Sequence, residues 1–502
     1  MPKSQKYRKM RIAIILILFV LSGCVRSSSS NPFEVQATPV STNPAEMVAS
    51  VTAEITALPT STNTPEPTPT MEVAQEAGLN GYSFVALLDY NKHTLNVQES
   101  IAYRNTTGQE LNEIQLAVPP NETEGVFTLE EVSLNEGEPV SDYSLEGIVL
   151  TIPFTTTLAE DETCKISLKY QLALKINGGI LGYTAMQANF SDWYPFVPPY
   201  DAELGWLIKQ PAEVGEYLMY DMANFELTLA LSNGDGLVVA GSTLVMPVEI
   251  NIYKMIEQNS RGITFSVSDQ YQVLSRQYGD FTVNAYVFPG DETAGWATVE
   301  NTGKALLLFS TLFGQTYPHE TLSVVESDFP DGMEYDGLYY LSDFYYKNYN
   351  GSNENYLSLL SVHETAHQWW FGLVGNDQAN EPWLDEALAT YSEYLYYEQY
   401  LPGLTDWWWQ YRVETYNPSG RSDMTIYDQS DLRTYINSAY LQGAAFLHEL
   451  RQALGDEAFF ANLQTYLATY QYQNARGDDF LGIMIPAASE DTNRILEKYF
   501  RE

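Results

Sequence analysis

The spacing of apolar residues changes near Arg276, and this change divides the sequence into two parts that must fold differently. Over residues 78–277, apolar residues alternate with polar ones, as in TLNVQESIAY (94–103) and FELTLALS (225–232). An alternation with a period of two places one set of side chains on one face of a β-strand. From about Tyr356 onward, apolar residues recur with the spacing of helices instead. The chain is therefore expected to contain a β-domain followed by a domain with many helices.

Two domain ranges follow from this division. Turn signals such as NTTG and SNGDG separate the strands expected in residues 77–275, which we predict to form an antiparallel β-domain. In residues 276–502, ATVENTGKALLLFSTLFG (297–314) predicts a helix and TLSVVES (321–327) predicts a buried strand. The second domain is therefore predicted to be a mixed α/β domain that is mainly helical.

The N-terminal residues predict an export signal, which is not a part of the fold. Basic residues precede the apolar segment IAIILILFVL (12–21), which is about half as long as a membrane-spanning helix. The sequence LSGC that follows resembles the lipobox of bacterial lipoproteins, in which the cysteine becomes the lipidated first residue of the mature chain. This resemblance implies that residues 1–23 are removed, that Cys24 carries a lipid, and that the protein is held at the extracytoplasmic face of the cell membrane. An uncleaved anchor helix is the alternative.

Residues 24–76 are rich in Ser, Thr and Pro, as in PTSTNTPEPTPT (59–70), and are expected to form a disordered tether of about 40 Å or more. The second cysteine of the chain, Cys164, lies in an alternating segment and is expected to be a small buried residue. With Cys24 lipidated, no intramolecular disulfide is possible. The hydrophobic core, together with a metal if one binds, must therefore hold the fold.

Acidic residues outnumber basic ones by 65 to 25, which gives a formal net charge of -40. This charge argues against nucleic acid as a partner, because phosphate binding requires clustered Lys and Arg. The acidity has two interpretations: a solvated, self-repelling surface, or an attraction for cations such as the ammonium group of a peptide. Composition does not decide between them, and nothing in the sequence indicates an oligomeric state.

The segment SVHETAHQWWFG (361–372) contains two of the five histidines of the chain, four positions apart. In a helix this spacing directs His363 and His367 from one face toward a single point. Two imidazoles so placed suit a zinc ion, and the carboxylate of Glu364 can reach a water molecule on the metal. A pair of hydrogen-bonded histidines on a buried helix is the alternative.

A catalytic zinc ion needs a third protein ligand, and Glu386 is the candidate. Gly372 and Gly375 are expected to end the first helix, and NEPWLDEALATYSEYLYY (380–397) predicts a second helix. The short connection favours an antiparallel pair of helices. Glu386 lies one turn into the second helix, with eighteen residues between it and His367, where it can face the histidines.

This pattern resembles that of the gluzincin zinc metallopeptidases, and specifically of the membrane alanine aminopeptidase family. It consists of the string HETAH, eighteen further residues and the glutamate of WLDE (383–386). FPDGMEYDGL (329–338) is similar to the Gly-x-Met-Glu-Asn segment of that family, and SAYLQGAAFLHELR (438–451) is similar to its Tyr-x-Lys-Gly-Ala helix. The resemblance implies a saddle-like antiparallel β-domain followed by a thermolysin-like catalytic domain. It also implies one zinc ion per chain and peptide substrates with a free N-terminus. The sequence ends before the large helical C-terminal domain that many members carry.

The chemistry of peptide hydrolysis fits these residue types. Zinc bound by His363, His367 and Glu386 would lower the pKa of its water toward about 7. Glu364 would act as the general base and then pass the proton to the leaving amine. By the resemblance, the hydroxyl of Tyr440 would donate a hydrogen bond to the oxyanion that forms during attack.

Substrate binding is implied by the resemblance for three residues of one segment: Gly332, Met333 and Glu334. In the family this glutamate binds the free α-amine, through a charge-assisted hydrogen bond that an acylated N-terminus cannot make. YTAMQANFSDWYP (183–195) weakly resembles the family segment that supplies another amine-binding side chain, and Gln187 is the candidate there. The alternative for Gln187 and for the nearby Asn189 is that both are surface polar residues.

The chain departs from the family pattern at five positions. Asp331 replaces a Gly, Tyr335 and Asp385 each replace an Asn, Gln442 replaces a Lys, and Asn189 stands where an acidic residue is often found. The changes at Asp331, Tyr335 and Asn189 surround the expected amine site, so they leave open whether a free N-terminus is required.

Residues that orient the zinc ligands are expected on the helix of Glu386. Thr390 and Glu393 lie four and seven residues beyond it, on the same helical face, and could hydrogen-bond a ligand. A solvated helix face is the alternative.

The sequence thus predicts a lipid-anchored, zinc-dependent metallopeptidase that acts as an aminopeptidase outside the membrane. Two other functions remain open: a zinc peptidase without exopeptidase preference, and a surface-tethered peptide-binding lipoprotein without turnover. The joint presence of three ligands, a base and a tyrosine argues against the second of these.

Overall fold

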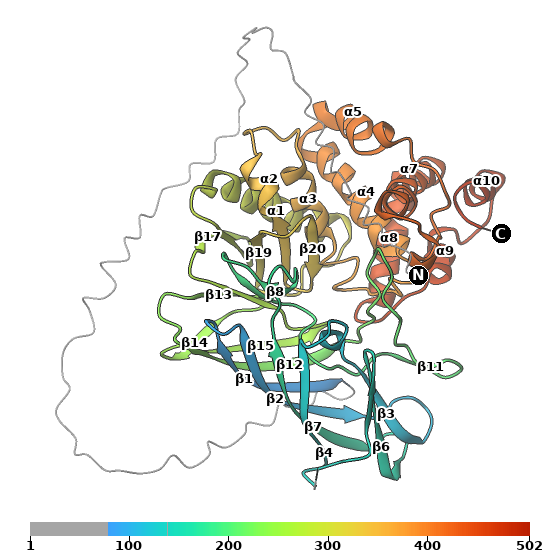
Figure 1. The fold of residues 1–502 in the computed structure, drawn as a ribbon. Coiled ribbons are helices and arrows are strands. Elements are labelled where there is room, and N and C mark those ends of the chain that lie inside the picture. Colours follow the sequence, from blue (N-terminus) through green and yellow to red (C-terminus); the bar gives the residue numbers. More distant parts are fainter. Residues whose placement is uncertain (1–78, 138, 502) are drawn as a thin grey trace, which may run out of the picture. The chain divides into compact units, whose positions relative to one another are not determined.

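The computed structural model describes residues 79–137 and 139–501, in which strands precede helices along the chain (Figure 1). The predicted export signal (1–23), the predicted lipidation site Cys24 and the whole predicted tether (24–76) lie outside the described residues. Within the described part, no helix combines the length and apolar composition that crossing a membrane requires.

The first domain is built on a seven-stranded sheet. Its strands, in spatial order, are β14 (Met246–Glu249), β15 (Ile252–Ser260), β12 (Ala223–Ser232), β1 (Asn80–Asp89), β2 (Thr94–Arg104), β7 (Thr163–Ala173) and β4 (Phe127–Leu134). Every neighbouring pair is antiparallel except β1 and β12, which run parallel from the pairing of Asn80 with Ala223. The antiparallel prediction is thus confirmed for this sheet, apart from one pair.

Two smaller sheets and a hairpin complete the first domain. The three-stranded sheet contains β3 (Leu111–Ala117), β6 (Val149–Leu158) and β5 (Ser144–Glu146); the four-stranded sheet contains β13 (Val238–Gly241), β16 (Phe265–Ser268), β9 (Ala188–Phe190) and β8 (Leu181–Tyr183); the hairpin pairs β10 (Tyr200–Asp201) with β11 (Gly205–Trp206). Alternating residues of these strands form one hydrophobic core, which includes the unpaired and buried Cys164, as predicted.

One charged side chain lies on the buried face of β2. Glu99 shares this face with the apolar residues Val97 and Ile101 and is 3% exposed, and in the described part of the chain neither carboxylate oxygen has a hydrogen-bond partner. Burial disfavours the charged form and raises the pKa of Glu99 well above its ordinary value of 4.5. The folded protein therefore keeps a proton on Glu99 at pH values at which the unfolded chain has lost it. The stability that this protonation contributes is fully present below pH 4.5, and it is lost as the pH rises through the raised pKa of the folded state.

Replacing Glu99 with Met is expected to stabilise the protein more at pH 8 than at pH 5. An apolar side chain of similar length removes the cost of burying an unpartnered carboxyl, which is about 1–3 kcal/mol. The thermal unfolding midpoint at both pH values measures this difference. The exposed Glu146 of β5 offers a control, since Glu146→Met should give no such dependence on pH. Equal shifts for Glu99→Met at both pH values would refute the account of Glu99.

The second domain contains a mixed five-stranded sheet. Its spatial order is β17 (Gln272–Tyr278), β18 (Phe281–Val287), β19 (Thr321–Ser327), β21 (Leu338–Ser342) and β20 (Gly332–Tyr335). The predicted strand 321–327 is therefore confirmed as β19, and β18, β19 and β21 run parallel. The predicted domain boundary at residue 276 falls inside β17, because Gln272–Tyr278 pairs with β18 as the first strand of this sheet. β20 is the edge strand and pairs only with β21.

Helices make up most of the rest of this domain. They are α1 (Glu292–Leu312), α2 (Asp343–Lys347), α3 (Tyr356–Ala366), α4 (Trp383–Tyr400), α5 (Thr405–Trp408), α6 (Leu432–Tyr435), α7 (Gly443–Leu454), α8 (Asp456–Tyr470), α9 (Gly477–Met484) and α10 (Glu490–Tyr499), with π-helical segments η3 (Trp409–Val413) and η6 (Ile436–Gln442). α1 packs against β17, β18 and α3, and α4 packs against α3, α7 and η6, around one large core. Figure 1 shows this arrangement in yellow to red.

A buried ionic cluster joins the two domains beside the β20–β21 hairpin. His319 lies between two carboxylates, with Nδ1 2.8 Å from Glu257 of β15 and Nε2 2.7 Å from Asp336, which follows β20. Burial lowers the pKa of His319, but the two carboxylates outweigh it and raise the pKa to about 10. Arg261 donates its backbone N–H to Asp336 and its Nε–H to the carbonyl of Gly372. These contacts fix the hairpin against the first domain.

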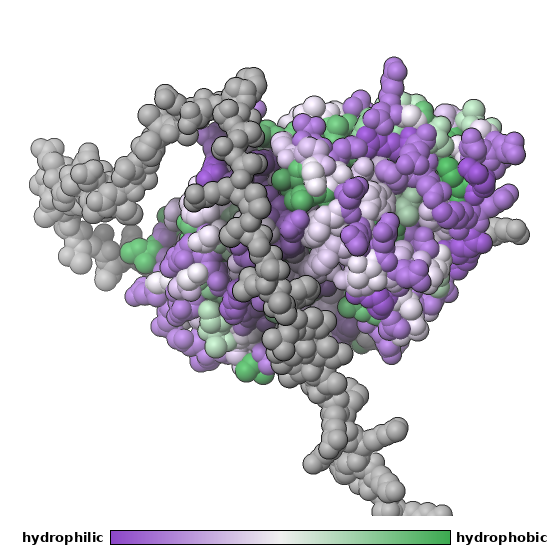
Figure 2. Space-filling model, turned by 90° about the horizontal axis from the view of Figure 1, so that it is seen from above, coloured by the Kyte–Doolittle hydropathy of each residue, from purple (hydrophilic) through white to green (hydrophobic). Residues whose placement is uncertain are grey.

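Hydrophilic residues cover most of the surface of the helical part when it is viewed from above (Figure 2). Apolar residues form only small, separate patches on this face.

Candidate metal centre

The two histidines lie at the C-terminal end of α3. His363 belongs to its last turn, and His367 directly follows Ala366, the last residue of the helix. The sequence prediction that Gly372 and Gly375 end this helix is corrected by the structure. The helix ends at Ala366. A wider turn follows it, in which the N–H of Gly372 donates to the carbonyl of His367.

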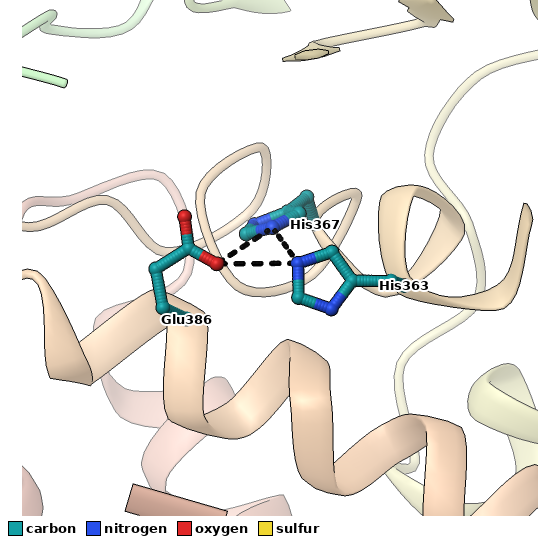
Figure 3. Close-up of side chains that lie close together, drawn as sticks. All are labelled: His363, His367 and Glu386. Atoms are coloured by element: carbon teal, nitrogen blue, oxygen red, sulfur yellow. Dashed lines mark hydrogen bonds and ion pairs between the residues drawn. The ribbon is translucent and has the colours of Figure 1, made fainter. Parts of the chain in front are cut away.

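The three predicted ligands converge on one point (Figure 3). His363 Nε2 lies 3.2 Å from His367 Nε2 and 3.2 Å from Glu386 Oε2, and His367 Nε2 lies 3.5 Å from the same oxygen. A tetrahedral zinc ion about 2.0–2.1 Å from each ligand holds the ligand atoms about 3.3–3.4 Å apart. The three buried side chains, from α3 and α4, therefore fit a zinc ion.

The second nitrogen of each imidazole has a hydrogen-bond acceptor. His363 Nδ1 lies 2.9 Å from Glu393 Oε1, and His367 Nδ1 lies 3.0 Å from the carbonyl oxygen of Trp370. Both acceptors favour the tautomer that carries its proton on Nδ1. Each Nε2 lone pair is then free to face a metal.

Glu393 is held by residues that the sequence patterns did not reveal. Its carboxylate is fully buried and accepts hydrogen bonds from Arg412 Nη2 and Nε at 2.9 and 3.0 Å and from Trp408 Nε1 at 3.0 Å. Burial raises the pKa of Glu393, but the charge of Arg412 outweighs it and the net shift is downward. Thr390, the other predicted orienting residue, is placed differently: its buried hydroxyl has no hydrogen-bond partner among the described residues.

Replacing Glu393 with Gln is expected to weaken zinc binding about 10–100-fold, the usual effect of losing such a partner. The amide no longer provides a negative charge to the Nδ1 proton of His363. Competition with a chromogenic chelator measures the dissociation constant. Glu398 is a matched control, because it lies on the same helix and also pairs with an arginine, Arg451, at 2.9 Å. Equal affinities for Glu393→Gln and Glu398→Gln would contradict the role of Glu393.

The carboxylate of Glu364 lies against the backbone of β20. A Cβ atom on Gly332 would come within 2.2 Å of Glu364 Oε1, so only glycine leaves room for the carboxylate there. Glu364 Oε2 is buried without a hydrogen-bond partner among the described residues. Burial raises the pKa of Glu364 to about 8. A carboxyl group whose pKa lies near neutral pH can accept a proton and later return it.

Tyr440 reaches the site from the π-helical segment η6. Its hydroxyl donates to Glu386 Oε1 at 2.6 Å, and its ring lies parallel to that of His363, 5.7 Å away. Burial raises the pKa of Tyr440 well above its ordinary value, so the phenol stays protonated and can donate. Such single π-helical turns are frequent at functional sites.

Glu334 of β20 belongs to the same buried cluster. Its carboxylate, that of Glu364 and an imidazole nitrogen of His367 offer atoms that all lie within 4.8 Å of one another. Gln378 Nε2 donates to Glu334 Oε1 at 3.2 Å and to Asp385 Oδ2 at 2.9 Å. Asp385 thus links the amine-site candidate to the helix of Glu386, and burial raises its pKa to about 8.

Gln187 does not reach this cluster, and its prediction as an amine ligand is wrong. Its Nε2 donates to Asn189 Oδ1 at 2.7 Å and to Tyr271 at 2.9 Å, while its Oε1 accepts from the backbone N–H of Asp328 at 3.2 Å. The side chain is fully buried and has no free polar atom for a ligand.

A carboxylate that the sequence did not reveal, Glu216, stands in its place. Glu216 and Glu334 both line a cavity of about 160 Å³, and Met333 forms part of the wall. Glu216 Oε2 accepts a hydrogen bond from Tyr435 at 3.1 Å. The preceding Gly215 has φ +80°, and a Cβ there would meet Ile426 at 2.5 Å, so glycine is needed to direct Glu216 into the cavity.

The two departures beside Glu334 have structural explanations. Asp331 adopts φ 71°, a left-handed conformation that favours glycine and that Asp tolerates better than most residues. Its side chain accepts a hydrogen bond from Tyr345 at 3.1 Å. Tyr335 lines the cavity, and its hydroxyl donates to Asp192 Oδ2 at 3.0 Å.

Comparison with known proteins supports the same site. Residues 297–499 match the model of the Peptidase family M1 domain. Aminopeptidase 2, mitochondrial, of Saccharomyces cerevisiae is 28% identical over 252 residues, 47% of this chain and 26% of that protein. Aminopeptidase N of Lactobacillus helveticus is 24% identical over 304 residues, 56% of this chain and 36% of that protein. The alignments thus span only about a quarter to a third of these relatives.

A solved structure has the same fold over most of both chains. The crystal structure of M1 zinc metallopeptidase from Deinococcus radiodurans gives a TM-score of 0.61 at 17% identity, covering 84% of this chain and 93% of that one. A β-domain followed by a mainly helical domain is therefore the shared architecture.

Proposed function

We propose that this chain, in which residues 297–499 match the Peptidase family M1 domain, is a zinc-dependent aminopeptidase that releases N-terminal residues from peptides. The observation that carries the proposal is the convergence of His363 Nε2, His367 Nε2 and Glu386 Oε2 within 3.5 Å. Glu364 lies next to them, and its Oε2 has no hydrogen-bond partner within residues 79–137 and 139–501, so this oxygen can serve as a proton acceptor.

His363, His367 and Glu386 would hold a zinc ion, and its Lewis acidity would make a water molecule acidic enough to lose a proton near neutral pH. Glu364 accepts that proton and later transfers it to the leaving amine. Tyr440 is the neutral donor at the site, and its hydroxyl stabilises the oxyanion that develops on the scissile carbonyl. The fixed Nδ1 hydrogen bonds of His363 and His367 keep both rings oriented throughout.

The arrangement of β20 favours an exopeptidase. As an edge strand, β20 can pair with the backbone of an extended peptide, which would then run alongside Gly332 and Glu334. Glu334 and Glu216 together present two carboxylates at the cavity, where a free α-ammonium group offsets their burial. An endopeptidase would need the space beside Glu334 and Glu216 to be open and free of negative charge, because the peptide chain would continue through it.

Hydrolysis of one peptide with a free and with an acetylated N-terminus tests this proposal. The expected result is that the free peptide is cleaved at its first bond and that the acetylated peptide is not cleaved. Equal rates would favour a zinc peptidase without exopeptidase preference. Absence of cleavage of both peptides by the zinc-loaded chain would favour the peptide-binding alternative.

We further propose attachment to the extracytoplasmic face of the cell membrane through lipid on Cys24, supported by the basic and apolar segments that precede LSGC. Incorporation of a labelled fatty acid into the full chain, but not into a Cys24→Ser variant, is the expected result. Equal labelling of both chains would argue against this attachment.

A further inference from the structure

The cavity beside Glu334 has an acidic end that the proposed chemistry does not use. Asp192 lines this cavity, and its carboxylate is oriented by two phenols: Tyr220 donates to Oδ1, and Tyr335 donates to Oδ2 at 3.0 Å. A carboxylate has about four acceptor positions, so two remain after these hydrogen bonds. Asp192 also adopts φ 50°, a left-handed conformation that sets the direction of its side chain.

The walls between Glu334 and Asp192 are largely apolar. Ile180, Leu218, Met333 and Phe371 line the cavity, together with the rings of the two tyrosines. Such walls suit an aliphatic chain, and the volume of about 160 Å³ suits one extended side chain. A substrate side chain held in this cavity would therefore contact apolar surface along its stem, and Asp192 offers a carboxylate to its head group.

No lysine or arginine pairs with the acidic groups of this cavity among residues 79–137 and 139–501. Asp192, Glu216 and Glu334 all line it, and the ion pairs of the described residues include none of the three. One α-ammonium group could offset only one of these three charges. The carboxylate of Asp192 would still lack a cation.

We propose that Asp192 makes this cavity select N-terminal lysine or arginine, whose aliphatic stem contacts the apolar walls and whose cationic head contacts the carboxylate. The inference rests on the proposed aminopeptidase function and names its substrate class. Tyr335, which replaces the Asn of the family pattern, is one of the two tyrosines that hold Asp192 in this orientation, together with Tyr220. Separately, burial raises the pKa of Asp192 and outweighs the two phenol hydrogen bonds, which lower it. A bound cation would replace the solvation that this carboxylate loses on folding.

The test compares aminoacyl reporter substrates that differ only in the terminal charge of the side chain. Lysyl and norleucyl amides of one fluorophore share the same unbranched stem, and kcat/KM is measured for both with the full zinc-loaded chain. We expect at least a tenfold preference for the lysyl substrate. In Asp192→Asn, which keeps the shape, accepts from one phenol through Oδ1 and can donate to the oxygen of the other phenol through Nδ2, this lysyl-to-norleucyl ratio should fall at least tenfold.

The control removes a nearby carboxylate outside the cavity. Glu122 accepts a hydrogen bond from Tyr217 at 2.7 Å but does not line the cavity, and Glu122→Gln should leave the ratio unchanged. A norleucyl preference in the parent chain, or an equal loss of both activities in Asp192→Asn, would overturn the inference while leaving the aminopeptidase function standing. Failure to hydrolyse either substrate would overturn both, because the selectivity requires the activity.

Discussion

The Glu364→Gln variant is expected to lose at least about 10²–10⁴-fold in kcat while binding zinc like the parent chain. The amide keeps the size of the side chain, so the space beside Gly332 stays filled, but it cannot accept the proton of the attacking water. Glu364 does not belong to the group of three ligand atoms, so the metal content should be preserved. Steady-state hydrolysis and metal analysis of the same preparation measure both quantities.

The exposed Glu354, just before α3, provides the matched control. Glu354→Gln changes the same functional group on the same stretch of chain and should keep full activity. A Glu364→Gln variant that hydrolyses peptides at the parent rate would remove Glu364 from the mechanism, whatever the zinc content.

Replacing Glu334 with Gln is expected to lower kcat/KM for a peptide with a free N-terminus about 10–150-fold. This corresponds to ~1.5–3 kcal/mol, the contribution of a hydrogen bond to a charged group. The carboxylate is 5% exposed, so solvent screens it little. The ratio of kcat/KM for free and acetylated forms of one peptide isolates this effect from any general loss of activity.

Glu216→Gln should have a smaller effect on that ratio, because Glu216 is partly exposed and its carboxylate already accepts a hydrogen bond from the hydroxyl of Tyr435. If Glu334→Gln left the ratio unchanged, Glu334 would not be the amine-binding residue. A larger effect at Glu216 than at Glu334 would assign that role to Glu216 instead.

The zinc ligands could be predicted because local geometry connects them. The four-residue spacing of His363 and His367 fixes their common face as soon as the segment is helical, and Glu386 lies in the next helix along the chain. The period of the apolar residues likewise predicted the order of the domains. The exact end of α3 could not be predicted, because the wide turn at Gly372 depends on the packing around Arg261.

Residues brought in from distant parts of the chain left no local signal. Arg412 reaches Glu393 from a π-helical segment, and Glu216 enters the cavity through a glycine turn, so neither lies near a motif. The opposite error occurred at Gln187, where a weak resemblance suggested a ligand. The hydrogen bonds of this side chain with Tyr271 and Asp328 depend on tertiary packing that its own segment does not encode.

Glu99 illustrates a third kind of limit. The alternation in β2 correctly predicts a buried face, yet one position of that face carries a carboxylate. Periodicity assigns a residue to a face of the strand, but it does not reveal how a buried charge is tolerated there.

The zinc content of the purified protein after dialysis against metal-free buffer tests the central claim most directly. With three converging ligands, the parent chain should retain about one zinc ion per chain, whereas a His363→Ala, His367→Ala double variant should retain none. A parent chain without zinc, or a double variant with as much zinc as the parent, would contradict the proposed metal centre.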